Sequence, residues 1–139
     1  MKKINPSEQS ICIGFNDALL LAKTANKIKC GEDFVWFHIP NGQRAGSNKS
    51  LRMLAGGIEK RMGTLKGVPD YFLMWTEGNV VKFGYMEAKS KTGALKPEQK
   101  KFRDYCKDKN IPWALFRSIK EGVDVLKEWD VVDEGFIVT

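Results

Sequence analysis

Hydrophobic residues recur along the chain at spacings that predict four helices and four strands. Between residues 5 and 27 the apolar positions are three or four apart, which is typical of a helix that packs one face on a core. Asn5 can cap this helix, with Pro6 at its first position. The predicted inner stripe comprises Glu8, Ile11, Cys12, Phe15, Leu19 and Ala22.

Aromatic and β-branched residues concentrate in four shorter runs, which we expect to be strands. Residues 33–39 form the first run, which the segment Pro40 to Gly42 stops. Residues 71–75 and 80–89 flank the turn sequence TEGN, and this arrangement favours an antiparallel hairpin. Residues 112–118 form the fourth run.

Three further helices complete the predicted order. One face of Leu51 to Met62 is apolar, although Gly56 and Gly57 weaken the helix. Pro97 begins another helix, and residues 119–129 form the last. The order αβαββαβα predicts an α/β fold in which helices flank a mixed central sheet. The last strand follows a helical crossover, so we expect it to be parallel to its neighbour.

Composition is that of one soluble globular domain over residues 1–139, with 42% hydrophobic and 29% charged residues. No apolar run approaches the roughly 20 residues that cross a bilayer, so we expect no membrane association. Cys12, Cys30 and Cys106 form no CxxC pair, which argues against a disulfide framework or a zinc site. A reducing cytoplasm fits this pattern.

Positive charge is unevenly distributed within the net charge of +6. Residues 41–67 hold six basic residues against Glu59 alone, and residues 89–109 hold eight against three acidic ones. The tail from residue 121 is acidic. This separation indicates a polyanionic partner such as nucleic acid, the alternative being scattered, solvated lysines. The candidate phosphate contacts are Arg44, Lys49, Arg52, Arg61 and Lys66.

Three charged residues interrupt the apolar hairpin at one end. Glu87 and Lys89 project from the same side of their strand, and antiparallel pairing brings Asp70 to them. Two carboxylates in one place repel each other unless a cation offsets them, and Mg²⁺ prefers such oxygen ligands. With Lys89 beside the metal, the group suits phosphodiester hydrolysis.

A structural reading of these charges is also open. Asp70 can cap a turn after Pro69, and Glu87 can pair with Lys89 at an exposed strand end. His38, as a lone histidine on an aromatic strand, is expected to be structural. The four tryptophans lie at apolar positions and are expected in the core.

Sequence around the hairpin resembles a nuclease signature. Pro69 and Asp70, followed after sixteen residues by Glu87 to Lys89, resemble the signature of the PD-(D/E)XK superfamily. The longer segment from Lys66 to Trp129 is similar to the VRR-NUC family within it, through a G-x-PD, an E-x-K, a following G-x-L and a helix bearing glutamine.

The resemblance implies a restriction-endonuclease-like core with a Mg²⁺ or Mn²⁺ site. By motif position, Asp70 and Glu87 are implied as metal ligands together with the backbone carbonyl of Ala88. Lys89 is implied as the catalytic lysine, and Gln99 matches the helix glutamine. Gln99 also lies on the sheet-facing side of its helix, where a buried amide needs partners that an active site would provide.

Glu8 is the candidate for the acidic residue that such folds place on their first helix. Its position on the apolar stripe supports a role in metal binding. The alternative is a capping box with Asn5, because the two residues have the required spacing.

These features predict a metal-dependent endonuclease that hydrolyses DNA. Stand-alone members of the family resemble Holliday junction resolvases and tend to dimerise, which implies branched or flapped DNA and a homodimer. The alternative is a non-catalytic nucleic-acid-binding module on the same fold. A restriction enzyme with base-specific readout would need further elements, for which little chain remains.

Overall fold

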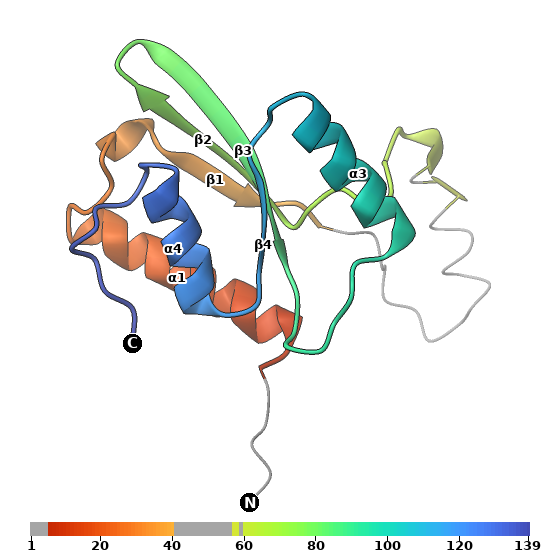
Figure 1. The fold of residues 1–139 in the computed structure, drawn as a ribbon, viewed down its shortest axis with the longest axis horizontal. Helices are drawn as coiled ribbons and strands as arrows, with labels where there is room; N and C mark the ends of the chain where they lie inside the picture. Colours follow the sequence, from red (N-terminus) through yellow and green to blue (C-terminus); the bar gives the residue numbers. More distant parts are fainter. Residues whose placement is uncertain (1–5, 41–56, 59) are drawn as a thin grey trace, which may run out of the picture.

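The fold combines one sheet with three helices of at least ten residues in a computed structural model that describes residues 6–40, 57–58 and 60–139 (Figure 1). The chain order within these residues is α1 (Glu8–Thr24), the 3₁₀ turn η1 (Gly31–Asp33), β1 (Val35–His38), β2 (Tyr71–Glu77), β3 (Val80–Ala88), α3 (Pro97–Asp108), β4 (Trp113–Phe116) and α4 (Ile119–Glu128).

The sheet is mixed, with the strand order β1-β2-β3-β4. β1 and β3 are both antiparallel to β2, and β4 is parallel to β3. Gly78, with φ of 59°, and Asn79 form the tight turn between β2 and β3. The predicted α/β class, hairpin and parallel crossover are therefore confirmed.

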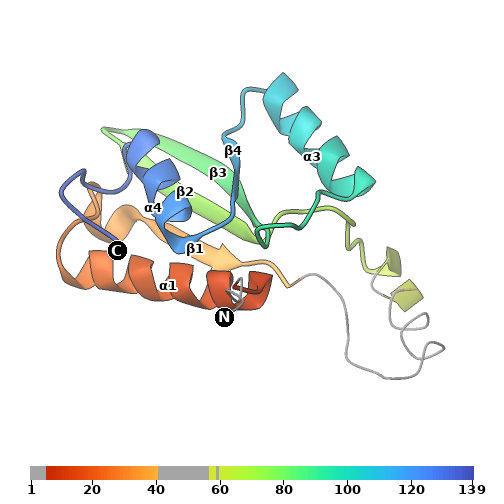
Figure 2. The ribbon, with the colours of Figure 1, turned by 60° about the horizontal axis from the view of Figure 1, so that its bottom comes forward.

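Helices lie on both faces of the sheet, as Figures 1 and 2 show. α1 and α4 cover one face, where Phe15 and Leu126 meet Leu73 and Met86 in a closed core. On the other face α3 packs through Phe102, whose ring lies 5.0 Å from that of Tyr85. This arrangement leaves the end of the hairpin between the first turns of α1 and α3.

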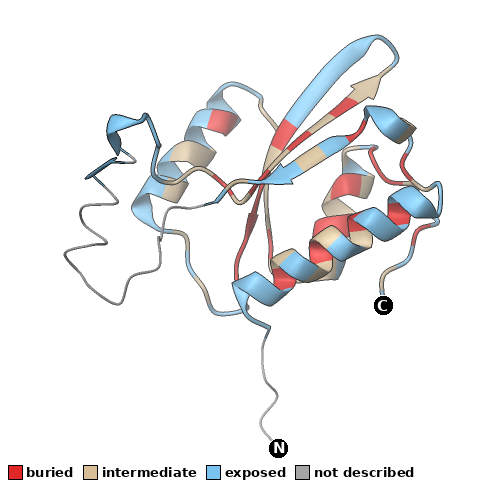
Figure 3. Ribbon diagram, turned by 180° about the vertical axis from the view of Figure 1, so that it is seen from behind, coloured by how far each residue is buried: buried red, intermediate tan, exposed pale blue. Residues whose placement is uncertain are grey.

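Tryptophan side chains contribute to packing, as predicted. Trp75 is buried and stacks on Trp129 with ring centroids 5.5 Å apart. Trp36 packs against the core and donates from Nε1 to Asn16 Oδ1 at 2.8 Å. Figure 3 shows how burial alternates with exposure along the helices and strands around this core.

The start of α1 differs from the prediction. Ser7 is the N-cap, and its hydroxyl accepts from the backbone N–H of Ser10 at 3.1 Å. Glu8 is thus the first helical residue rather than the third, so the proposed capping box with Asn5 is wrong. The helix also ends at Thr24, three residues before the predicted end. Its apolar stripe is confirmed, because Ile11, Phe15, Leu19 and Ala22 are all buried.

Several predictions concern residues outside the described part of the chain. They include Asn5, Arg44, Lys49, Arg52 and most of the predicted helix from Leu51 to Met62, of which residues 57, 58, 60 and 61 are described and helical. All three cysteines are described, and each is a free thiol. Within the described residues, no helix has the length and apolar character to cross a membrane.

Candidate active site

The hairpin brings the charged residues of the motif together at its end. Tyr71 pairs with Met86, which places Asp70 beside the end of β3. Asp70 Oδ2 accepts from the backbone N–H of Ala88 at 2.8 Å. The carboxylate therefore bridges the two strands, whereas the structural reading expected it to cap a turn after Pro69.

Glu87 and Lys89 are buried, with only 2% and 5% of their surfaces exposed. Met86 and Ala88 alternate with them and point into the core. Gln99 of α3 donates from Nε2 to Glu87 Oε1 at 3.0 Å, and its own Oε1 accepts from the Lys96 N–H at 2.8 Å. Gln99 therefore reaches the site, and Glu87 and Lys89 do not form the exposed pair that the structural reading expected.

Lys89 forms its ion pair with α1. Its Nζ lies 3.4 Å from Glu8 Oε1, and the Glu8 side chain is half-exposed. The first turn of α1 thus contributes a carboxylate to the same end of the sheet. The structure brings Glu8 together with Lys89, while its binding of a metal stays a prediction.

The two carboxylates of the hairpin lie in an unfavourable environment. Burial, followed by the charge of Asp70, raises the pKa of Glu87 to about 8, against the opposing effect of Lys89. Burial also raises the pKa of Asp70, although the Ala88 N–H opposes this shift. No hydrogen-bond partner among the described residues reaches Glu87 Oε2. The positive charge of Lys89 therefore compensates the two carboxylates only in part.

The donor set fits a hard divalent cation. No group of three or more His, Cys, Asp and Glu side chains within the described ranges is placed to hold a metal. The carboxylate oxygens of Asp70 and Glu87 lie together at this end of the hairpin, where the motif also implies the Ala88 carbonyl as a ligand. Mg²⁺ commonly binds one or two carboxylates and keeps several waters, so this set suits it, whereas structural zinc takes four protein ligands.

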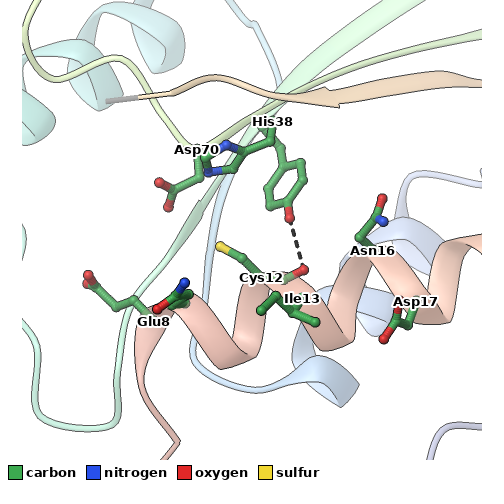
Figure 4. A pocket seen from close by; sticks show the side chains of 9 residues that line it. Glu8, Cys12, Ile13, Asn16, Asp17, His38 and Asp70 are labelled. Carbon is green, nitrogen blue, oxygen red and sulfur yellow. Dashed lines mark hydrogen bonds between the residues drawn. The ribbon is translucent and has the colours of Figure 1, made fainter. Parts of the chain in front are cut away.

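An open groove of about 530 Å³ adjoins Asp70 (Figure 4). The residues of α1 form one wall, and the ends of β1 and β2 form the other. His38 is exposed here, with its ring edge-to-face on Tyr71 at 5.3 Å. Tyr71 in turn donates its hydroxyl to the Cys12 carbonyl at 3.0 Å.

Sequence reasoning missed His38 as a residue of this site and treated it as structural. Its place depends on the pairing of His38 with Tyr71, which follows Asp70 directly. A signal was present, because a strand paired next to the hairpin must bring one end toward Asp70. The sequence does not show the register of β1 on β2, which decides that the His38 end of β1 lies beside Asp70.

Arg117 was also missed. Its Nη1 donates to the carbonyls of Ser90 and Gly93, at 2.7 Å in each case. This side chain follows β4 and holds the loop that leaves Lys89. No local pattern marks it, since the contact spans the whole β3-α3-β4 crossover.

Charge is separated along the molecule. Arg61 and Lys66 are exposed in the segment that leads to Asp70. At the other end of α1, Asp130 pairs with Lys29, and Ile28 forms a bridge with Val132. The acidic C-terminal segment therefore lies away from the candidate site (Figure 2).

Comparisons with known proteins agree with this geometry. A solved structure titled "VRR_NUC domain protein" superposes with a TM-score of 0.55 at 15% identity, covering 98% of this chain and 100% of that one. This likeness shows the fold. No curated protein matches the chain. The family model of the VRR-NUC domain matches residues 21–119, which include Asp70, Glu87, Lys89 and Gln99 but not Glu8. Because that match spans well over half of the chain, the protein belongs to the VRR-NUC domain family.

Proposed function

We propose that residues 1–139 form a single nuclease domain that hydrolyses DNA phosphodiester bonds in a metal-dependent endonucleolytic reaction. The observation that carries the proposal is that Asp70 and the buried Glu87 meet beside Lys89, while Glu87 Oε2 has no hydrogen-bond partner among the described residues. A protein that only binds DNA gains nothing from clustered carboxylates facing a polyanion, because they would repel the phosphates.

Asp70, Glu87 and the Ala88 carbonyl are the proposed ligands for Mg²⁺ or Mn²⁺, and Glu8 is the candidate further ligand. The ion, when bound, supplies the charge that lowers the pKa of a water molecule and neutralises a phosphate. Gln99 orients the Glu87 carboxylate through its hydrogen bond.

Lys89 is the proposed catalytic lysine. Its ammonium group is buried at the site, where it can donate to the attacking water or to a phosphate oxygen as negative charge develops. Glu8 holds this ammonium group in place through the ion pair at 3.4 Å.

DNA is the proposed substrate because exposed basic residues lead into and out of the site. Arg61 and Lys66 precede Asp70, and the basic segment 89–109 follows Glu87. We include branched and flapped DNA among the substrates. One chain carries one such site, so cutting both strands of a junction requires two copies, and we propose a homodimer.

The test is incubation of the pure protein with linear, flapped and four-way-junction DNA in Mg²⁺, Mn²⁺ or EDTA. We expect metal-dependent cutting that Lys89→Ala abolishes while DNA binding survives. Lys91→Ala is the matched control, because Lys91 is an exposed lysine two positions beyond the motif.

Two results would contradict this assignment. Undiminished cutting by both Asp70→Ala and Lys89→Ala would place the reaction elsewhere in the protein. Tight binding without metal, together with no cutting of any of the three substrates, would indicate the non-catalytic binding module instead.

A further inference from the structure

We propose that the groove beside Asp70 accepts an unpaired nucleobase of the strand that is cut. The inference rests on the proposed nuclease function and specifies its substrate. The nucleotide next to the cleaved phosphate must lie outside a duplex, as it does in a flap or an open junction.

The position of the groove connects it to the reaction. Asp70 lies at its edge, so a nucleotide in the groove would have its phosphate beside the candidate metal ligands (Figure 4). Its volume of about 530 Å³ is within the roughly 300–1,000 Å³ that small-molecule sites occupy. The groove is therefore large enough for a base while remaining continuous with the active site.

Its walls offer surfaces on which a base can stack. The His38 ring is exposed, and its orientation is maintained because Tyr71 supports it and is itself anchored to the Cys12 carbonyl. On the opposite wall Ile13 is 57% exposed. Bases stack on aromatic and apolar side chains whatever their sequence, so this pair suits a base of any kind.

The charge of the groove favours a base over a phosphate. Asp17 lines it at the end far from Asp70 (Figure 4), and its carboxylate would repel a phosphate that entered there. Carboxylates instead accept from the amino groups of bases. Asn16 also lines the groove, and its hydrogen bond with Trp36 uses Oδ1, which leaves its NH₂ group for a base carbonyl.

A base within a duplex would have to unstack and unpair before it entered. That cost is smallest for a nucleotide that is already single-stranded. The groove therefore provides a physical reason for selecting flaps and open junctions over linear duplex, without readout of the sequence.

An abasic scan tests the inference. A single abasic site is moved along the cut strand of a flapped substrate, and kcat/KM is measured at each position. We expect about a tenfold loss when the abasic site adjoins the cut, and little change elsewhere. Uniform values of kcat/KM across the scan, with cutting intact, would show that the groove does not bind a base. The proposed nuclease function would be unaffected by that result.

Variants of the groove provide the second arm. His38→Ala should lose about tenfold on the intact substrate and become insensitive to the abasic site, whereas His38→Phe should retain stacking. Ile13→Ser should weaken cutting, while Leu21→Ser is the matched control, since Leu21 is 61% exposed on the same helix and does not line the groove. Equal effects of Ile13→Ser and Leu21→Ser would contradict the proposal.

A binding measurement separates the groove from catalysis. Lys89→Met, which keeps a long side chain at the buried position, is mixed with flapped DNA carrying 2-aminopurine at successive positions in Mg²⁺. We expect a fluorescence change at one position beside the cut, lost when His38→Ala is added. No position-dependent change would overturn the inference even if the wild-type protein cuts DNA.

Discussion

At the residue scale, Glu87 reduces the stability of the metal-free protein. Its folded pKa of about 8 exceeds its ordinary value of 4.5, because the side chain is buried near Asp70. A raised pKa means that the folded state holds the proton more tightly than the unfolded state. The protonated Glu87 therefore contributes its full stability to the fold below about pH 4.5, and this contribution is lost as the pH rises to about 8.

Glu87→Gln should therefore stabilise the metal-free protein at pH 8. The amide cannot ionise, and its oxygen still accepts from Gln99, so we expect a gain of about 2 kcal/mol at pH 8 and little gain at pH 4.5. Thermal unfolding in EDTA at the two pH values measures the difference. An identical gain at both would show that ionisation of Glu87 is not the cause.

Bound metal should restore the stability that repulsion between the Asp70 and Glu87 carboxylates removes. Since an ion that binds only the folded state stabilises it, Mg²⁺ at about a hundred times its Kd should add about 2.7 kcal/mol to the wild type. Asp70→Asn and Glu87→Gln should lose most of this gain. Thermal unfolding at pH 8 with and without Mg²⁺ is the measurement, and an equal metal response in all three proteins would contradict the proposed ligands.

At the scale of elements, Gly67 allows the chain that leads to Asp70 to pack against α3. Its φ is 88°, and a Cβ there would lie 2.4 Å from the carbonyl oxygen of Glu98. Gly63 has a similar φ of 92°, but no atom lies within 4 Å of its Cβ position.

Gly67→Ala should consequently cost more than Gly63→Ala. Both substitutions strain the backbone by about 1 kcal/mol, and only the first also displaces the first turn of α3. We expect losses of about 3 and about 1 kcal/mol in urea unfolding. Equal losses in the free energy of unfolding would show that the close approach of Gly67 to Glu98 does not affect stability.

Arg117 links β4 to the loop that follows Lys89. Arg117→Gln removes charged hydrogen bonds to the carbonyls of Ser90 and Gly93, so we expect a loss of about 2 kcal/mol. Trypsin should also cleave faster at Lys91. Arg103→Gln is the control. Among the described residues Arg103 pairs with its neighbour Asp104 alone, so this substitution should cost less than about 1 kcal/mol.

At the scale of the whole molecule, one face of the sheet carries an aromatic surface that consists of Phe37, Phe72 and Phe83. The ring centroids of neighbouring pairs lie 5.4 and 5.7 Å apart, and Phe37 is 49% exposed. No described helix covers this part of the face. A second copy, related by a two-fold axis, would bury the same surface on both chains.

Phe37→Glu should therefore disrupt the proposed homodimer. A charge within an apolar interface costs several kcal/mol because it is desolvated without a partner. Light scattering at micromolar concentration should show a dimer for the wild type and a monomer for this variant. Ile137→Glu, at an exposed residue outside the aromatic surface, should remain dimeric. A monomeric wild type would contradict the homodimer itself.

Much of the fold and the centre of the site could be predicted from local patterns. Strands alternate with period two, and a tight turn sets the register of a hairpin, so Asp70 had to lie near Glu87. The inner stripe of α1 follows from its helical spacing in the same way. The helix start was mispredicted because Asn5 and Ser7 are both good caps, and the sequence alone does not rank them.

The sequence by itself determined the hairpin and the meeting of Asp70, Glu87 and Lys89, since these depend on neighbours within about twenty positions. It also determined that β4 is parallel to β3, because a helical crossover joins the two strands. Only the tertiary structure decided that Glu8 pairs with Lys89, that Gln99 holds Glu87, and that His38 faces the groove. Each of these contacts joins separate elements, and its geometry depends on how α1, α3 and β1 pack on the sheet. That packing results from the shape of the whole core, which no local pattern contains.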